Sequence, residues 1–159
     1  MSYVERRTLR MSPAEEAAYL QRHQWGRLAT VSPEGEPHVT PVGYVFLAGR
    51  IYFHGLVRSR RGRHIAQGSR LCLCVDDGVD DGQGYRERRG VVVYGDVRVL
   101  GPEDRDLLAR VRDHYAERFF GRTDIHYERR THAWYELTPD RTTSWDFSKI
   151  PRGADRFSD

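Results

Sequence analysis

A serine followed by a run of arginines is the densest chemical signal in the sequence. Ser59-Arg60-Arg61-Gly62 offers one hydroxyl and two guanidinium groups, and Arg58 and Arg63 extend the patch. A phosphate group is held by several hydrogen-bond donors that carry positive charge, and the free N–H groups at a helix start add to them. The segment therefore predicts a phosphate site. The alternative is a solvated basic surface, which is what charge runs usually form.

His54 is the second candidate. It ends the run Ile51-Tyr52-Phe53-His54, whose β-branched and aromatic residues favour a strand. A histidine there hydrogen-bonds a ligand or donates a proton near neutral pH. The alternative is a strand histidine that is bonded to a neighbouring strand.

Metal and thiol chemistry have weaker support. Cys72 and Cys74 are two residues apart in an expected core strand, where a disulfide would be strained and a metal would need two more ligands. The chain has no G-x-S-x-G motif for a serine nucleophile. Four further residues have spacings that match no compact metal-ligand motif, so we expect structural or surface roles for His114, Asp124, His126 and His132.

The elements that must position these residues are mostly strands. A capping box at Ser12-Pro13-Ala14-Glu15 predicts a helix over about 13–24. Pro102 opens another predicted helix, whose one apolar face consists of Leu107, Leu108, Val111, Tyr115 and Phe119. Ser59 caps a short helix at 60–67. Residues 76–90 read as a long polar loop that acts as a lid. The expected strands are 26–31, 37–47, 51–54, 70–75, 90–100, 132–137 and 142–147, the last two joined by a turn at Pro139-Asp140.

Length and composition bound the architecture. The chain has 159 residues, with 26 basic against 23 acidic side chains, which indicates one domain with a mildly basic, mixed surface. We expect an N-terminal extension (1–11), one domain (12–150) and a frayed tail (151–159). The fold class is mainly β (α+β): a small antiparallel barrel covered by two or three helices. No apolar run approaches a membrane span, and the start lacks a signal-peptide pattern, so we expect a cytoplasmic protein.

Four sequence blocks in this order resemble the flavin-binding split barrel of the pyridoxamine 5′-phosphate oxidase-like superfamily. They are GRLATVSPEGEPHVTPVGYVF (26–46), GRIYFHG (49–55), SRRGRHI (59–65) with RLCLCVDD (70–77), and VVVYGDVRVL (91–100). The third block is similar to the family's Ser-Arg-Lys-Gly phosphate motif, with Arg61 in place of lysine. The first two look closest to the nitroimidazole-reductase-like branch, and other relatives use the deazaflavin F420 or bind haem.

The resemblance implies an FMN-dependent oxidoreductase that transfers hydride at the flavin N5, working as a homodimer with its cofactor at the subunit interface. It places the isoalloxazine along 38–43, where Pro41 also marks an edge or bulge because proline cannot complete a strand ladder. Trp145 is expected either to wall the partner's cofactor pocket or to serve core or interface packing. Tyr44 and Tyr85 are expected to face substrate, Tyr85 only because it lies in the long loop. The implied cofactor-binding residues are Thr40, Pro41, Val42, Phe53, His54, Arg58, Ser59, Arg60, Arg61 and Trp145.

Three alternatives stay open. The same fold with F420 would also suit a basic groove. A non-catalytic flavin- or haem-binding barrel would use His54 or His64 as the haem ligand. A nucleic-acid module ranks last, because the arginine clusters at 58–63, 86–89 and 127–130 are interrupted by acids and lack interleaved exposed aromatics.

Overall fold

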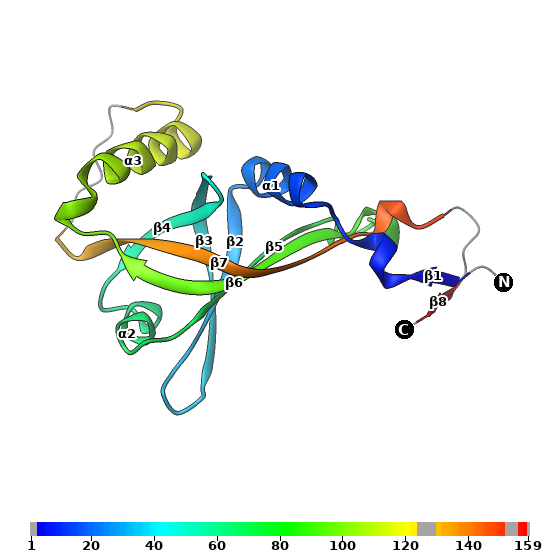
Figure 1. Ribbon diagram of the computed structural model, residues 1–159, viewed down its shortest axis with the longest axis horizontal. Helices are drawn as coiled ribbons and strands as arrows, with labels where there is room; N and C mark the ends of the chain where they lie inside the picture. Colours follow the sequence, from blue (N-terminus) through cyan, green and yellow to red (C-terminus); the bar gives the residue numbers. More distant parts are fainter. Residues whose placement is uncertain (1–2, 124–129, 152–155, 159) are drawn as a thin grey trace.

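The computed structural model describes residues 3–123, 130–151 and 156–158. Six strands close into a barrel in the order β2-β3-β4-β7-β6-β5, and every neighbouring pair is antiparallel (Figure 1). The barrel strands are β2 (Trp25–Val31), β3 (Pro37–Leu47), β4 (Arg50–Leu56), β5 (Leu71–Asp77), β6 (Arg89–Val99) and β7 (His132–Asp146). The expected antiparallel barrel with helical cover is confirmed.

Three helices lie outside the barrel: α1 (Pro13–Arg22), α2 (Arg60–Ala66) and α3 (Arg105–Phe120). The expected capping box starts α1, since the Ser12 hydroxyl accepts from the Glu15 amide at 3.3 Å and Glu15 Oε2 accepts from the Ser12 amide at 2.6 Å. Short 3₁₀ turns at Arg6–Leu9, Tyr85–Glu87, Pro102–Asp104 and Phe147–Lys149 complete the connections. None of the helices described is long and apolar enough to cross a membrane.

Two apolar clusters follow from the alternation of side chains along the strands. One fills the barrel interior, with Leu28, Phe53, Leu73 and Leu137 almost fully buried. The other lies on the outer surface of β3, β4 and β7, where Val111 of α3 covers Tyr52 and Trp134. Helix α3 is therefore held against the outside of the barrel by its own apolar face.

The expected turn at Pro139-Asp140 is wrong. Residues 132–146 form one strand, and it pairs with β6 along that strand's whole length. The register skips Asp140, because Tyr94 opposes Arg141 while Gly95 opposes Pro139. The proline is thus absorbed by a β-bulge that bends the strand instead of reversing it.

Two short strands near the ends of the chain pair with each other. Strand β8 (Arg156–Ser158) pairs in parallel with β1 (Tyr3–Glu5). This two-stranded sheet lies at the end of the molecule opposite α2 and α3 (Figure 1).

The ladder between β3 and β4 is short. It runs only from the pair Tyr44/Phe53 to the pair Leu47/Arg50. Beyond it, Pro37–Gly43 pairs with β2, whereas His54–Leu56 pairs with β7. We call the interval between these two strand segments the split.

Candidate functional site

The structure places Arg61 of α2 in the split. Its Nη1 donates to Oγ1 of Thr40 on β3 at 3.1 Å. On the opposite side, a Cβ added to Gly55 of β4 would overlap Nη2 of the same guanidinium. The guanidinium therefore spans the two strand segments, and a glycine at 55 leaves the room that it needs.

The charge of Arg61 has no carboxylate partner among the residues that the structure describes. Burial lowers the pKa of the Arg61 guanidinium, because the surrounding protein replaces water that would stabilise the cation. The Phe53 ring centroid lies 5.9 Å from its Cζ, which gives partial cation–π compensation. A half-buried guanidinium without an acid favours the binding of an anion.

The other members of the arginine patch are placed differently. The Ser59 hydroxyl caps α2, since it accepts from the Gly62 amide at 3.0 Å and donates to the Leu56 carbonyl at 2.7 Å. Its proton is thus already donated within the protein. Arg60 is exposed and lies 3.6 Å from the Glu36 carboxylate, while Arg58 is exposed beside the helix start. Arg60 and Arg58 are free to move toward a ligand, whereas Arg61 is fixed in place.

His54 lies on the outer face of β4, beneath α3. Its ring centroid is 4.8 Å from that of Tyr115, 4.9 Å from Trp134 and 5.9 Å from His132. Burial, with smaller contributions from His132 and Arg61, lowers the pKa of His54 to about 4. At neutral pH this side chain is a neutral imidazole, which differs from the near-neutral pKa considered from the sequence.

Helix α3 packs on the Gly43 end of the split and contributes aromatic residues that the sequence indicates only as part of an apolar helix face. A Cβ on Gly43 would lie 2.8 Å from Cζ of Phe119 and 3.1 Å from the Tyr115 hydroxyl oxygen. Phe119 also packs edge-on against Trp25, which is 59% exposed. The split is therefore bordered by an arginine from α2 and by aromatic rings from α3, with His54 adjoining these rings.

Several residues expected to contact cofactor or substrate are core residues instead. Val42 and Phe53 face the barrel interior, and Phe53 stacks on Tyr135 with ring centroids 5.1 Å apart. Tyr44 is fully buried, and its hydroxyl donates to the Leu20 carbonyl at 2.8 Å. Strand alternation turns these side chains into the barrel interior, where they pack in the core and do not face solvent. Thr40 is half-buried and Pro41 is exposed, both at the split.

Trp145 and Tyr85 lie away from the split. The Trp145 ring covers Gly90 so closely that a Cβ there would overlap it. Tyr85 stacks on Phe147 with ring centroids 4.7 Å apart. Neither residue approaches Arg61 within this chain.

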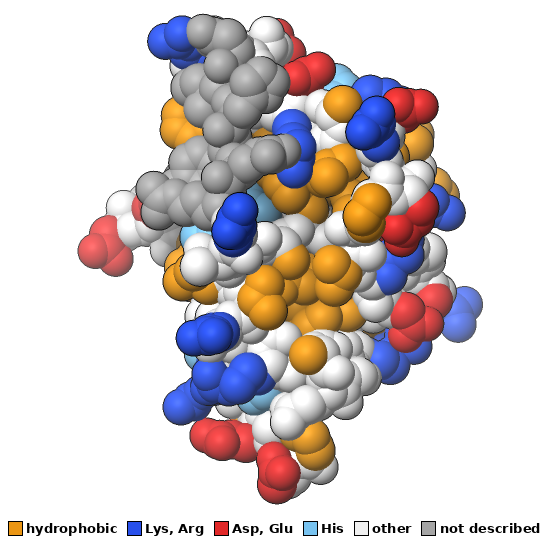
Figure 2. Space-filling view, turned by 90° about the vertical axis from the view of Figure 1, so that its left-hand side faces the viewer, with side chains coloured by type: hydrophobic (Ala, Val, Ile, Leu, Met, Phe, Trp, Pro, Cys, Tyr) orange, Lys and Arg blue, Asp and Glu red, His pale blue; other side chains and the backbone are white. Residues whose placement is uncertain are grey.

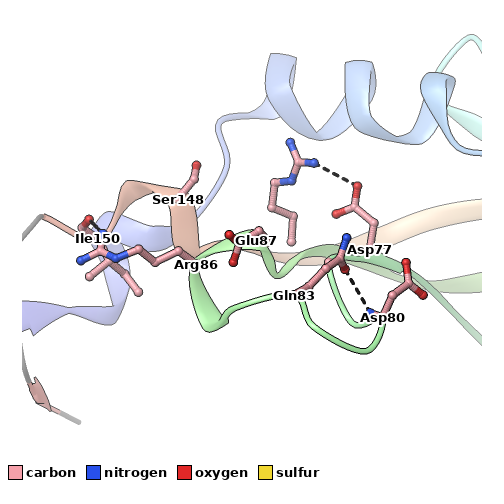
Figure 3. Close-up of a pocket in the computed structure, with 9 residues that line it drawn as sticks. Asp77, Asp80, Gln83, Arg86, Glu87, Ser148 and Ile150 are labelled. Atoms are coloured by element: carbon pink, nitrogen blue, oxygen red, sulfur yellow. Dashed lines mark hydrogen bonds and ion pairs between the residues drawn. The ribbon is translucent and has the colours of Figure 1, made fainter.

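The loop that carries Tyr85 is tied down at its end. Arg86 donates to the carbonyl oxygens of Ile150 and Pro151. A cavity of about 610 Å³ lies beside this loop, and Arg89, which lines it, donates to Asp77 at 3.1 Å. Figure 3 shows Asp77, Arg86 and Glu87 among the side chains that line this cavity. Arg89 is paired with Asp77, and both terminal nitrogens of Arg86 already donate to backbone carbonyls, so the guanidinium groups of this cavity are less open to an anion than that of Arg61.

The remaining candidates do not gather into a metal-binding group in the described part of the chain. No group of three or more His, Cys, Asp or Glu side chains there is arranged to hold a metal. His114 is exposed, His132 lies beside His54, and Asp124 and His126 fall outside the described residues. Cys72 and Cys74 are free thiols whose pKa values are raised by burial. His64 is buried, with Nδ1 2.9 Å from Oγ1 of Thr30.

Figure 2 views the end of the molecule that carries α2 and α3. Hydrophobic side chains gather at its centre, with positively charged side chains on both sides. Leu56 and Val57, in the connection from β4 to α2, are 50% and 44% exposed. This surface fits a ligand that joins an anionic group to a flat apolar body.

These features define the class of the protein. It is an antiparallel barrel in which the β3–β4 ladder is interrupted, and the Arg61 guanidinium lies in the interval. The sequence profile described as pyridoxamine 5′-phosphate oxidase matches residues 12–146. The chain belongs to this family.

Individual relatives add detail. The chain is 34% identical over 103 residues to the 5a,11a-dehydrotetracycline/5a,11a-dehydrooxytetracycline reductase of Streptomyces rimosus, covering 62% of this chain and 71% of the reductase. A conserved hypothetical protein of Mycobacterium tuberculosis superimposes with a TM-score of 0.77 at 27% identity over 92% of both chains. A FAD-binding protein of Mesorhizobium loti, at 19% identity and a TM-score of 0.62 over 85% of this chain and 94% of its own, shows the shared fold.

Proposed function

We propose that this protein is an oxidoreductase that uses a flavin-type cofactor, FMN in the first instance, bound at the split. The observation that carries the proposal is the Arg61 guanidinium, which is half-buried and has no carboxylate partner among the described residues. A cofactor phosphate would supply the missing negative charge. Membership of the pyridoxamine 5′-phosphate oxidase family and similarity to a reductase support the assignment.

The residues at the split fit such a cofactor. Gly55 leaves the space that the Arg61 guanidinium itself occupies, and Thr40 holds the guanidinium from the other side. Arg60, which is exposed at the first position of α2, adds a second cation, and unlike Arg61 it is mobile. We assign phosphate binding to Arg61 and Arg60, and positioning of Arg61 to Thr40.

A bound flavin supplies a centre that accepts and donates hydride. Around it, the chain's own residues exclude water and fix orientation. Tyr115 and Phe119 of α3 cover the split beside Gly43, and His54 presents a neutral imidazole between Tyr115 and Trp134. In this form one ring nitrogen of His54 donates a hydrogen bond and the other accepts one, so we assign it a positioning role and not that of a cationic acid.

For the substrate, we take the class named by the reductase relative as the first to test. That enzyme acts on 5a,11a-dehydrotetracycline and its oxy analogue, which are multi-ring compounds. The exposed Trp25 and the rings of Tyr115 and Phe119 offer stacking surface beside the split. We therefore propose a conjugated multi-ring substrate.

We also propose that the chain works as a homodimer. Val31 and Val39, which are 41% and 59% exposed, share one face of the β2–β3 ladder with Trp25. Exposed apolar side chains that share one face of a sheet are typical of a protein–protein contact. Light scattering after gel filtration tests it: a mass near twice 18.5 kDa supports the dimer, and a mass near 18.5 kDa contradicts it.

The functional proposal is tested by parallel titrations of the purified protein with FMN and with F420, followed by turnover assays with each reduced cofactor. Saturable FMN binding and reduction of a dehydrotetracycline support the proposal as stated. Preferential F420 binding would replace FMN by a deazaflavin on the same fold. If neither cofactor binds, the oxidoreductase assignment fails.

A further inference from the structure

The face of β3 that carries Thr40 also carries a histidine, His38. Both side chains are partly buried, whereas Pro37, Val39 and Pro41, which alternate with them, are exposed. Because side chains alternate along a strand, His38 and Thr40 point to the same side of β3. Val39, which we assign to the homodimer contact, points to the opposite side. His38 therefore lies at the split and outside the face assigned to the partner.

Helix α2 faces this side of β3 at two points. Nη1 of Arg61 donates to Thr40 at 3.1 Å, and the His64 ring centroid lies 6.0 Å from that of His38, edge to face. Arg61 precedes His64 by three residues on the helix, and His38 precedes Thr40 by two on the strand. Residues at these spacings are neighbours on one side of a helix or strand. The Arg61 guanidinium and the His38 ring are therefore neighbours between α2 and β3.

Most of the charge around His38 is positive. The charged and titratable groups that face it are Arg60, Arg61 and His64 of α2 and Glu36 of the preceding turn. Thr30, its partner in the β2–β3 ladder, carries no charge. Partial burial, followed by the positive charges of α2, lowers the pKa of His38, while Glu36, which is 70% exposed, acts in the opposite direction. Without a ligand the His38 ring is therefore neutral at neutral pH.

A bound anion would reverse this balance. A phosphate that pairs with Arg61 brings negative charge next to a ring that burial and nearby cations keep neutral. The anion offsets the positive charge, so that the ring takes up a proton from solvent and donates a charge-assisted hydrogen bond. Histidine is the side chain suited to such a response, because its ordinary titration falls between about pH 5 and pH 8.

We propose that His38 is a further binding residue for the cofactor phosphate, and that it takes up a proton when the phosphate binds. His38, Arg61 and Arg60 surround the phosphate at the α2 end of the split, and the flat ring system of the cofactor lies toward Tyr115 and Phe119 of α3. This assignment rests on the proposed function, because the anion that it requires is the phosphate of the cofactor. By linkage, affinity for that phosphate rises as the pH falls through the raised pKa of His38.

The ring signals of the histidines in the ¹³C-labelled full chain test proton uptake directly. Their pH titrations are compared in the free protein, with FMN, and with an equal concentration of riboflavin, which has the same ring system but no phosphate. We expect FMN to raise the pKa of His38 by about one pH unit or more and riboflavin to leave it unchanged. His114, exposed on α3, is the internal control and should respond to neither ligand.

His38→Gln is the matched variant, since glutamine keeps a neutral hydrogen-bond donor but cannot take up the proton, and His114→Gln is its control. The FMN affinity of each variant is divided by that of the unmodified chain, so that ionisation of the FMN phosphate itself cancels. His38→Gln should bind FMN about three- to tenfold more weakly than the unmodified chain near pH 6 and within about twofold of it near pH 8. His114→Gln should match the unmodified chain at both pH values.

The results separate this assignment from the proposed function. FMN binding with an unchanged pKa of His38, or the same affinity ratio for His38→Gln at both pH values, would overturn the role of His38 and leave the cofactor site standing. A riboflavin effect as large as that of FMN would also overturn it, because proton uptake would then not follow the phosphate. Failure of FMN to bind at either pH would overturn the role of His38 together with the FMN assignment.

Discussion

Arg61 gives the sharpest prediction, because its positive charge should favour cofactor binding but oppose folding of the ligand-free protein. Its guanidinium is half-buried without a carboxylate partner in the described chain, so in the ligand-free protein its desolvation opposes folding. Arg61→Gln removes that charge. It also removes the 3.1 Å bond to Thr40, which contributes about 1 kcal/mol. We expect the two effects nearly to offset, so that the free energy of unfolding changes by less than about 1 kcal/mol.

Cofactor binding should respond much more strongly to the same change. A charge-assisted hydrogen bond to phosphate contributes about 1.5–3 kcal/mol, which corresponds to FMN binding that is roughly 10- to 100-fold weaker. Fluorescence titration with FMN measures the affinity, and urea unfolding of the ligand-free protein measures stability. Arg63→Gln, on the same helix, is the matched control, because the Arg63 guanidinium donates to the Arg58 carbonyl and not into the split.

Two outcomes would refute this reasoning. Unchanged FMN affinity in Arg61→Gln would show that the guanidinium does not bind the phosphate. A loss of about 3 kcal/mol or more in unfolding free energy would show that Arg61 is chiefly a structural residue of the split.

Two further predictions concern groups next to the site. The pKa of His54 is about 4 in the folded chain and 6.5 when unfolded, so between these values only the unfolded state binds the proton and stability falls as pH drops. The unfolding free energy of the unmodified chain should therefore fall by about 1–3 kcal/mol more between pH 7 and pH 4.5 than that of His54→Gln. An equal fall in the variant and the unmodified chain would contradict the burial argument. Glu136 is 2% exposed and bonded to Tyr52 at 3.0 Å and to Arg98 at 2.9 Å. Glu136→Ala should lower the unfolding free energy by about 2–3 kcal/mol, since Arg98 is partly solvated, and a change below about 0.5 kcal/mol in urea unfolding would show that the pair contributes little.

Local patterns in the sequence predicted most of the fold. The capping box at Ser12 and Glu15 starts α1, and strand alternation located all six barrel strands. The error at Pro139-Asp140 arose because a proline and an aspartate signal a turn locally, while only the eleven-residue partner strand β6 shows that the ladder continues past them. The pairing of β8 with β1 joins the two ends of the chain, and no local pattern indicates it.

The site was predicted less completely, because the placement of its side chains depends on contacts between elements that are distant in the sequence. The basic segment at 58–63 was visible in the sequence, but not that Arg61 turns into the split while Arg60 stays in solvent. Tyr115 and Phe119 were recognised only as an apolar helix face, because their packing on Gly43 depends on a contact between distant elements. Tyr44 was expected to face substrate, yet its phase in β3 places it in the core.

The central claim is that a flavin-type cofactor binds at the split, and amide shift mapping during an FMN titration tests it most directly. We expect the largest shifts at Thr40, Gly55 and Arg61, the residues that surround the unpaired guanidinium. Shifts confined to the cavity between Asp77 and Glu87, with Thr40, Gly55 and Arg61 unaffected, would contradict the account.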